Sequence, residues 1–522
     1  MKIRFVTLGC KLNFAESSAL GKELLLRGHQ RATIHEVPDV CVVNTCSVTD
    51  AADHKDRQTI NQLHRKYPNA IIIVTGCYAQ LQPQQIAQIE GVDYVLGQNE
   101  KYDIPKLVDA LESDTRYPIS DTRSPISDTR SPISDTRYPI SDSRNPISDT
   151  QYPISAPRSP ISDTRYPISD SRNPISDTVR VANIREVEEF HGVHSADDRT
   201  RCFIKVQDGC NYFCTYCTIP YARGKSRNPK ISEIVKDAQL ALDQGAKELI
   251  ITGVNIGDFG RSTGETFIDL LRALDSLDDS ATSSVQHPVV QPPLGSSAAS
   301  TKQTLSAPTP SYRVRISSCE PNLLTDEIID FVAHSQHFAP HFHIPLQSGS
   351  NEVLKIMHRR YTRELFAERV QHIRQVMPHA FIGVDCMVGV RGETEEFWQD
   401  YLTFVRGLDV SQLHVFTYSE RANTRMLEMD LYVVPKQERQ RRSKILHEVS
   451  EEKLRQFYAK HADRKAVVLW ESKKEGEQMA GFTDNYIKVY GPYDKSKINT
   501  FELHSSSSKL RHSRRAIRGN YQ

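Results

Sequence analysis

The sequence predicts an α/β protein made of an N-terminal parallel α/β domain, a partial TIM-like (β/α) barrel and a small C-terminal β-barrel. Three observations predict this fold class. Residues 1–112 alternate short apolar runs with helical stretches, which is typical of a parallel sheet. Residues 195–432 repeat the same β-then-α order, which indicates a full or partial TIM-like barrel. Residues 457–507 hold short alternating strands, as small all-β barrels do.

The strands of the N-terminal domain are expected at four apolar, β-branched runs. These are IRFVTLG, VCVVNTC, AIIIVTGC and VDYVLG. Strands of a parallel sheet are buried on both faces, so they have continuous apolar runs of this kind. Helical stretches such as ESSALGKELLLRG and DHKDRQTINQLHRKYP lie between them and would supply the crossover connections.

Two inserts interrupt the ordered pattern. In residues 113–178 the unit PISDTRY/S repeats with a period of seven, and the proline in every unit excludes a coiled coil. With one clearly apolar residue per unit, the repeat is expected to be disordered or polyproline-like, with a β-solenoid as the alternative. Residues 279–311 form a low-complexity insert, rich in Ser, Pro, Ala, Thr and Gln, within the barrel.

The barrel is expected to use FIKVQDG, ELIITGVNIG, YRVRISS, HFHIPLQSGS, FIGVDCMVGV and SQLHVFTYS as strands. Functional side chains should then lie where these strands end. A charged connecting helix follows at residues 433–456, and residues 508–522 form a basic tail.

Net charge divides unevenly along the chain. The 522 residues carry a formal net charge of +1. From Val433 onward there are 20 Lys+Arg against 11 Asp+Glu, a net of +9, which leaves −8 for the rest. This asymmetry favours a nucleic-acid partner, although a solvated basic face is the simpler alternative. The sequence has no apolar run of about 18 residues and no secretory signal pattern, so no membrane role and a cytoplasmic location are expected.

Three of the ten cysteines form the motif CxxxCxxC. Cys210, Cys214 and Cys217 lie in DGCNYFCTYCTIPYARG, directly after a predicted barrel strand. Three thiolates at this spacing can hold three irons of a cubane cluster and leave the fourth iron open for a ligand. A zinc site or simple burial are the alternatives, but structural zinc usually takes four ligands in CxxC pairs.

Three further cysteines follow or end strands of the N-terminal domain: Cys10 in TLGCKLN, Cys46 in VNTCSVTD and Cys77 in VTGCYAQ. In a parallel sheet they share the carboxyl edge, where open α/β sheets bind ligands, so a second cluster with a free iron is expected. Simple burial is the alternative. The remaining thiols are interpreted as core residues: Cys41, Cys202, Cys319 and Cys386.

The CxxxCxxC motif resembles the radical S-adenosylmethionine (SAM) superfamily, and the two cysteine sets together resemble the methylthiotransferase family. The resemblance covers nearly all of the chain outside the inserts. It rests on KVQDGCNYFCTYCTIPYARGKSR, TLGCKLNFAES, NTCSVTDAADHKDRQ, ITGVNIGDFG, RISSCEP and the TRAM-like GFTDNYIKVYG. It implies an auxiliary-cluster domain, a radical SAM barrel and an RNA-binding TRAM module over residues 457–507.

The resemblance implies a transferase that modifies tRNA, with SAM and two 4Fe–4S clusters as cofactors. Cys210, Cys214 and Cys217 would hold the SAM-cleaving cluster, and the N-terminal cysteines the auxiliary cluster that carries the sulfur. Within the family, the motifs look most like those of the branch that acts on C2 of N6-threonylcarbamoyladenosine at tRNA position 37, which implies this substrate. Alternatives are N6-isopentenyladenosine, a ribosomal protein, a two-cluster redox carrier or a non-catalytic Fe–S RNA-binding paralogue.

The resemblance also implies SAM contacts and partners. The expected partners are the tRNA anticodon stem-loop and a one-electron reductant such as flavodoxin or ferredoxin, acting on a monomer. Arg223 and Arg227 are interpreted as exposed basic residues that could meet SAM or RNA phosphate, or neither. The residues expected to contact SAM, each with packing or loop shaping as the alternative, are Tyr216, Gly253, Asn255, Gln347 and Asp385.

Three residues depart from the family pattern. Val390 and Arg391 replace Phe-Pro in MVGVRGET, and Thr417 replaces Pro in HVFTYS. These changes are expected to reshape the barrel rim.

Overall fold

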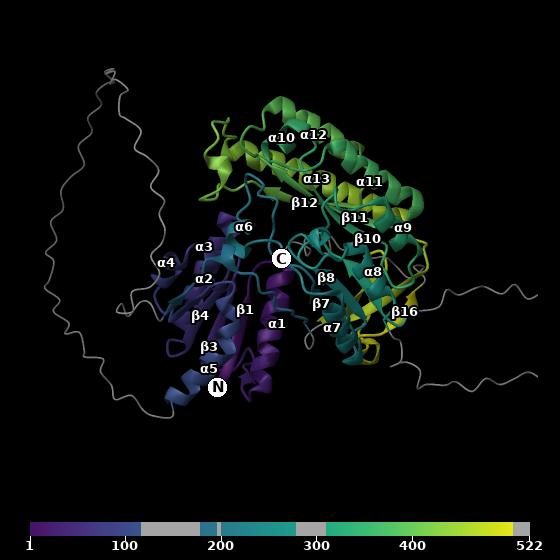
Figure 1. Ribbon diagram of the computed structural model, residues 1–522. Coiled ribbons are helices and arrows are strands. Elements are labelled where there is room, and N and C mark those ends of the chain that lie inside the picture. The colour runs from purple at the N-terminus through teal and green to yellow at the C-terminus, as the bar shows by residue number, and fades with distance from the viewer. Residues whose placement is uncertain (116–177, 196–199, 278–309, 505–522) are drawn as a thin grey trace, which may run out of the picture.

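The computed structural model describes residues 1–115, 178–195, 200–277 and 310–504 (Figure 1). Almost all of the predicted repeat, most of the low-complexity insert and the whole basic tail lie outside these residues, so the predictions made for them stay predictions. Among the described residues, no helix combines the length and the apolar character needed to cross a bilayer.

The N-terminal domain is a parallel sheet covered by helices, as predicted. Within the described residues its strand order is β2-β1-β3-β4-β5-β6. The central strands are buried along their length, as expected for a parallel sheet. Every residue of Val40–Thr45 is buried, and in Ile71–Gly76 only Ile71 is half-buried. The strands are β1 (Lys2–Thr7), β2 (Gln30–Arg31), β3 (Val40–Thr45), β4 (Ile71–Gly76), β5 (Tyr94–Leu96) and β6 (Val179–Arg180).

The last strand of this sheet comes from beyond the repeat. β6 pairs in parallel with β5, through Val95 opposite Val179 and Leu96 opposite Arg180. This pairing cannot be predicted from the sequence, because a two-residue strand has no periodicity. The helices of the domain are α1 (Lys11–Leu26), α2 (Asp50–Lys66), α3 (Cys77–Leu81), α4 (Pro83–Ala87) and α5 (Ile104–Thr115).

The barrel is an open arc of parallel strands. Two three-stranded sheets, β7-β8-β9 and β10-β11-β12, are joined by bridges from Val314 to Phe338 and from Ser318 to His343. This confirms the predicted partial barrel. Its strands are β7 (Arg201–Lys205), β8 (Glu248–Thr252), β9 (Arg313–Ile316), β10 (His341–Gln347), β11 (Phe381–Val388) and β12 (Gln412–Thr417).

Helices cover the outer face of the arc (Figure 1). The main apolar core lies between them and the strands, and the fully buried Trp398 is its largest side chain. Threonine caps start several of these helices, as when Thr394 accepts a hydrogen bond from the Phe397 amide. The helices are α6 (Ile219–Arg223), α7 (Ile231–Asp243), α8 (Phe267–Asp275), α9 (Asp326–His334), α10 (Asn351–Ile356), α11 (Arg363–Val376) and α12 (Glu395–Gly407).

The inner face of the arc is polar. Because side chains alternate along a strand, Val314 and Ile316 of β9 pack on the helices while Arg313 and Arg315 face the lumen. There both arginines form ion pairs with Glu248, at 2.5 and 3.0 Å. The lumen of this barrel is therefore a charged space at the amino ends of its strands.

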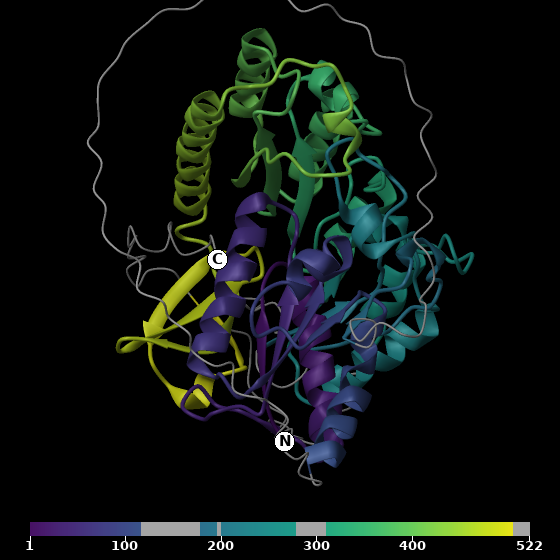
Figure 2. The same ribbon diagram turned by 90° about the vertical axis from the view of Figure 1, so that its left-hand side faces the viewer.

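A charged helix leads from the barrel to a small antiparallel sheet. α13 (Lys436–Lys460) ends a little beyond the predicted boundary, and Figure 2 follows it down to that sheet, whose strand order is β15-β14-β13-β16. This sheet is the predicted small β module. Its strands are β13 (Ala466–Glu475), β14 (Gln478–Thr483), β15 (Lys488–Pro492) and β16 (Phe501–His504).

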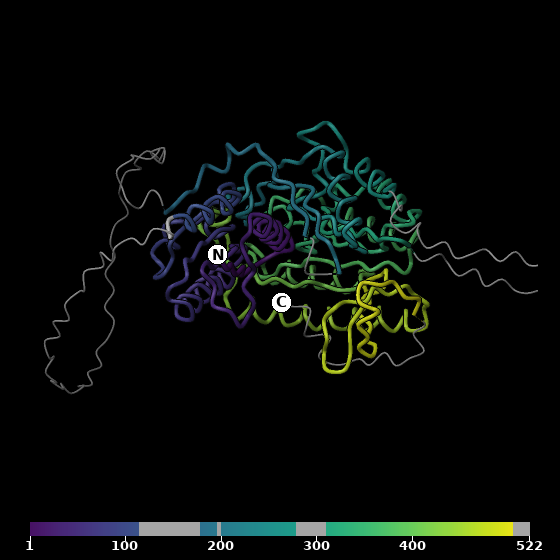
Figure 3. Tube along the Cα trace, turned by 90° about the horizontal axis from the view of Figure 1, so that it is seen from below, coloured from purple at the N-terminus to yellow at the C-terminus, as the bar shows by residue number. Residues whose placement is uncertain are grey.

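The C-terminal sheet packs against the amino ends of the barrel strands (Figure 3). Arg313 donates to the Phe482 carbonyl and Arg315 donates to the Asp484 carbonyl. Tyr486 packs on the ring of Phe381, with centroids 5.6 Å apart. One end of the lumen is thus closed by this module, and the carboxyl ends of the strands remain for the site.

Candidate functional site

One group of three cysteines lies at the carboxyl edge of the N-terminal sheet. Cys10, Cys46 and Cys77 follow β1, β3 and β4, which are neighbours in the sheet. The first loop approaches the second closely: a Cβ on Gly9, whose φ is +100°, would lie 2.7 Å from the Cys46 Cβ. Only glycine fits there without strain. We call these three residues the N-terminal triad.

The second group lies in the loop between β7 and α6. Cys210, Cys214 and Cys217, the barrel triad, are held by a compact turn in which the Cys217 amide donates to the Cys214 carbonyl at 3.0 Å. Thr215 ties this turn to the rim, because its hydroxyl donates to the Ile356 carbonyl at 2.8 Å. Both triads therefore lie after the carboxyl ends of strands, as expected.

The thiols of each triad are free and lie close enough to affect one another electrostatically. Burial raises the pKa of Cys210 to about 12, and the nearby Cys214 adds to this effect. Burial likewise raises the pKa of Cys46, with Cys77 and Cys10 adding to it. Buried thiolates at these positions would need a compensating positive charge, which a bound metal centre provides.

The spacing of the sulfurs tests which metal centre fits. Among the residues described, neither triad has all three sulfurs within 4.8 Å of one another. A single tetrahedral zinc, with Zn–S bonds of about 2.3 Å, would hold its sulfurs roughly 3.8 Å apart. Neither triad therefore has the compact arrangement of a single-ion site, and three cysteines are the ligand set that would leave one iron of a multi-iron cluster open.

Polar groups around the sulfurs also suit bound thiolates. The Gln98 amide donates to the Cys77 Sγ at 3.2 Å, and an Arg359 guanidinium nitrogen donates to the Cys214 Sγ at 3.1 Å. Arg359 also forms an ion pair with Glu320. Hydrogen bonds to cluster sulfurs tune the reduction potential. Sequence reasoning missed Arg359, although Glu320 lies in the RISSCEP segment that it singled out.

The two triads belong to segments that touch across the domain junction. The hydroxyl of Thr218, next to the last cysteine of the barrel triad, donates to the Ser47 carbonyl at 3.4 Å. Nearby, the Asp50 amide donates to the Ser419 hydroxyl at 3.0 Å. Docking of the N-terminal domain on the barrel therefore fixes one triad relative to the other.

A buried ionic network supports this junction. Arg223 of α6 forms an ion pair with Glu16 of α1 at 3.0 Å and another with Asp208 at 3.1 Å, and it donates to the Asn13 amide oxygen at 2.7 Å. The interpretation of Arg223 and Arg227 as exposed was wrong. Arg223 is 1% exposed and Arg227 is 9% exposed, because both pair with Asp208. Sequence alone does not give the buried acidic partners.

Of the five residues predicted to contact SAM, four lie at the carboxyl-end rim of the barrel and one lies deeper inside it. Tyr216 lies beside Arg359, with its hydroxyl 3.5 Å from the guanidinium. Gly253 and Asn255 follow β8, and both amide atoms of the buried Asn255 side chain lack a partner among the described residues. Gln347 ends β10 with a φ of +63°. These four residues lie at strand ends or in the cluster loop, where a ligand of the barrel triad would lie.

Asp385 lies deeper, inside β11. It accepts a hydrogen bond from His343 at 2.7 Å and lies 3.3 Å from the ring of His414. Burial alone would raise the pKa of Asp385, but His343 and His414 outweigh it and hold the pKa below its usual range. Asp385 is thus already engaged by two histidines, which sequence reasoning did not associate with it because they come from separate strands.

Two of the three residues that depart from the family pattern have a plain structural role. Val390 is fully buried in a small apolar cluster with Met357 and Tyr418. Arg391 forms an ion pair with Glu420 at 3.0 Å. The rim around the site is therefore packed and charge-matched at these two positions.

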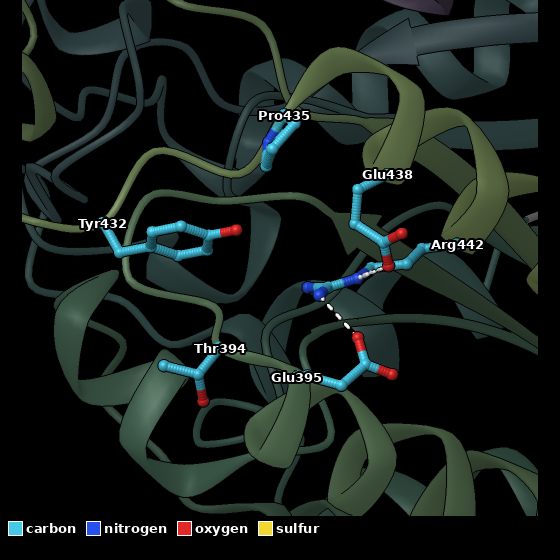
Figure 4. Close-up of a pocket in the computed structure, with 6 residues that line it drawn as sticks. All are labelled: Thr394, Glu395, Tyr432, Pro435, Glu438 and Arg442. Atoms are coloured by element: carbon cyan, nitrogen blue, oxygen red, sulfur yellow. Dashed lines mark hydrogen bonds and ion pairs between the residues drawn. The ribbon is translucent and has the colours of Figure 1, made fainter.

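A surface pocket of about 460 Å³ lies elsewhere, between the start of α12 and α13 (Figure 4). Its cation, Arg442, already forms ion pairs with Glu393, Glu395 and Glu438. No cysteine lines this pocket, and it offers no unmatched charge for a ligand.

Comparisons with known proteins identify the family of the chain. The model of uncharacterized protein family UPF0004 matches residues 2–97, and that of the radical SAM superfamily matches residues 204–405. The threonylcarbamoyladenosine tRNA methylthiotransferase MtaB of Bacillus subtilis is 31% identical over 93% of this chain and 89% of its own length. The chain belongs to the radical SAM methylthiotransferase family.

Two further relatives cover nearly the same length. MtaB of Aquifex aeolicus is 29% identical over 94% of this chain and 96% of its own. A tRNA-2-methylthio-N(6)-dimethylallyladenosine synthase of Parabacteroides distasonis is 25% identical over 97% of this chain and 94% of its own. As a member of this family the protein is a tRNA methylthiotransferase, an enzyme that uses SAM and two 4Fe–4S clusters.

Proposed function

We propose that the protein methylthiolates C2 of N6-threonylcarbamoyladenosine at position 37 of tRNA. The observation that carries this substrate is the match to the Bacillus subtilis MtaB over nearly the whole of both chains. The rival substrate is the one in the name of the dimethylallyladenosine synthase of Parabacteroides distasonis, which has a lower sequence identity to this chain. A tRNA substrate would place the enzyme in the cytoplasm, and we propose that it acts as a monomer with a flavodoxin or ferredoxin as its reductant.

The N-terminal triad would hold the auxiliary cluster and the barrel triad would hold the SAM-binding cluster. When bound, the clusters and SAM supply the sulfur, the methyl group and the one-electron chemistry that opens the C2–H bond. The protein has to bring the adenine between the two triads and keep it there. The Thr218–Ser47 contact and the Arg223 network hold the two triad-bearing segments together, which supports this positioning role.

SAM would lie at the carboxyl ends of the barrel strands. The unpartnered amide of Asn255 and the adjoining Gly253 are suited to bind its polar groups, and Tyr216 and Gln347 flank the same region. Asp385 would lie deeper in the barrel than these four residues, with its carboxylate already held by His343 and His414.

Nucleoside analysis of a deletion strain tests the substrate. We expect 2-methylthio-N6-threonylcarbamoyladenosine to disappear from its tRNA, to return when the wild-type gene is restored, and 2-methylthio-N6-isopentenyladenosine to be unaffected. Liquid chromatography with mass spectrometry measures both nucleosides. Loss of the isopentenyl product instead would assign the rival substrate.

The C-terminal sheet is proposed to bind tRNA as the TRAM-like module. On its β13–β14 hairpin, Lys473 and Lys474 are 77% and 50% exposed, and their ion pairs are long, at 3.8 and 3.9 Å. Deleting the module would uncover Arg313 and Arg315 at the end of the barrel, so point variants give a cleaner test.

Replacing both Lys473 and Lys474 by alanine is expected to weaken tRNA binding while SAM cleavage continues. Because each lost phosphate contact lowers the slope of log K against log salt by about 0.7–0.9, the slope should fall by roughly 1.5. Fluorescence anisotropy over a salt series measures this. Lys106→Ala, which removes an exposed lysine from the N-terminal domain, serves as the control. An unchanged slope in the double variant would place RNA recognition elsewhere.

A further inference from the structure

Lys11 is a cation next to the N-terminal triad that has no partner among the described residues. It is the first residue of α1 and directly follows Cys10. Its side chain is exposed, whereas the next two residues, Leu12 and Asn13, are buried. Within the described parts of the chain, its ammonium makes neither a hydrogen bond nor an ion pair. A lysine in this position has no structural task that the contacts reveal.

The charges around Lys11 are those of the barrel lumen. The groups that act on its ammonium electrostatically are Tyr486, Arg201, Arg315 and Asp385. The α1 helix packs along β7, with Phe14 edge-on to Phe203, so its first residue reaches the space between the N-terminal triad and the barrel.

The neighbouring charges are already matched. Arg201 forms an ion pair with Glu471 at 2.7 Å and Arg315 forms one with Glu248 at 3.0 Å. The carboxylate of Asp385 is held by His343 at 2.7 Å. Among the described residues of this group, Lys11 is the cation that still lacks an anion, and it directly follows Cys10 of the N-terminal triad.

The chemistry of the proposed substrate supplies such an anion. In adenine, N6 and C2 stand on the same edge of the ring, on either side of N1. A base whose C2 faces the auxiliary cluster therefore brings its N6 substituent close to the ligands of that cluster. The threonylcarbamoyl group ends in a carboxylate, whereas the dimethylallyl group is apolar and would leave the ammonium unpaired and desolvated.

We propose that Lys11 binds the carboxylate of the threonylcarbamoyl group and thereby selects this substrate over the dimethylallyl one. The inference rests on the proposed function, because it assumes that substrate. Lys11 is then a specificity-determining residue, and it takes no part in SAM cleavage. A lysine suits the role because its ammonium is a compact point charge that a single carboxylate can match.

The test compares two forms of one substrate on the reconstituted holoenzyme. Anticodon stem-loops carry either threonylcarbamoyladenosine or its methyl ester, which removes the negative charge and keeps the shape. With the wild-type enzyme, kcat/KM is expected to be about 10- to 100-fold lower for the ester, as for the loss of a hydrogen bond between charged groups. Lys11→Met should show the same loss on the acid and should no longer distinguish acid from ester.

Three controls separate this role from a structural one. Lys11→Arg keeps the charge and should keep most of the discrimination. Lys22→Met removes a lysine from the far part of the same helix, where it contacts Gln244, and should behave as wild type. Iron and sulfide content of each variant shows whether the clusters are intact, and stem-loop binding measured by anisotropy gives a readout independent of turnover.

The failures are distinguishable. A wild-type enzyme that modifies the acid and the ester equally well overturns the inference and leaves the proposed function standing, even where a Lys11 variant cannot be prepared. A Lys11→Met variant that still prefers the acid by the wild-type factor overturns it as well. A wild-type enzyme that modifies the dimethylallyl stem-loop and neither threonylcarbamoyl form refutes the proposed function itself.

Discussion

Replacing Cys46 by alanine is expected to abolish methylthio transfer while SAM cleavage to 5′-deoxyadenosine continues. The reason is that Cys46 belongs to the triad at the edge of the N-terminal sheet, whereas the SAM-binding cluster is assigned to the barrel triad. Iron analysis after anaerobic reconstitution should fall from about eight to about four irons per chain. Chromatography of the two products measures cleavage and transfer in the same reaction.

The reciprocal change separates the two clusters. Cys217→Ala is expected to lose 5′-deoxyadenosine formation and methylthio transfer together, again with about four irons remaining. Cys41→Ala is the matched control. Cys41 lies on β3, the strand that Cys46 follows, but its thiol is fully buried in the apolar core. It should retain about eight irons and both activities. A Cys46→Ala protein that keeps its iron and its transfer activity would contradict the assignment of the triads.

Replacing Arg223 by methionine is expected to destabilise the protein by about 3–5 kcal/mol, since it removes a buried cation that pairs with two buried carboxylates, Glu16 and Asp208. The side chains of Arg223, Glu16 and Asp208 are at most 4% exposed. Burial alone would raise the pKa of Glu16, but Arg223, together with two nearby lysines, outweighs it and holds the pKa below its usual value. The stabilisation is therefore present at neutral pH and is lost only as the pH falls below the ordinary range of a glutamate.

This substitution should also uncouple the two halves of the reaction. Because Glu16 belongs to the N-terminal domain and Arg223 to the barrel, the ratio of methylthio product to 5′-deoxyadenosine should fall. Chemical denaturation and the product ratio measure the two effects. Arg272→Met removes a half-exposed arginine that pairs with Asp269 and Glu327, and it should change either quantity little. An Arg223→Met protein with wild-type stability and product ratio would show that the network does not hold the junction.

Much of this architecture could be predicted from local sequence. The apolar runs ending at Cys46 and Cys77 form buried parallel strands, so both thiols lie at the same edge of the sheet. The CxxxCxxC spacing likewise places Cys210, Cys214 and Cys217 in one loop, because a few residues cannot span far. Periodicity and spacing act over short distances, and these features depend on nothing else.

The rest depends on contacts between distant segments. Arg223 looked exposed because its partner Glu16 is 207 residues away in the sequence. Asp385 was singled out without His343 and His414, which come from neighbouring strands of the arc. No sequence pattern pointed to Lys11, because its proposed role rests on the lack of a partner among the described residues of the folded chain. Pairing across domains has no local pattern, so the structure was needed to find it.

The most direct test of the substrate assignment uses the purified, reconstituted enzyme with SAM and a one-electron reductant. Two anticodon stem-loops of identical sequence would be offered together, one with threonylcarbamoyl and one with dimethylallyl on N6 of the same adenosine. Mass spectrometry of the digested RNA should find a methylthio group on the threonylcarbamoyl nucleoside and leave the dimethylallyl nucleoside unmodified. Methylthiolation of the dimethylallyl nucleoside alone would contradict the account.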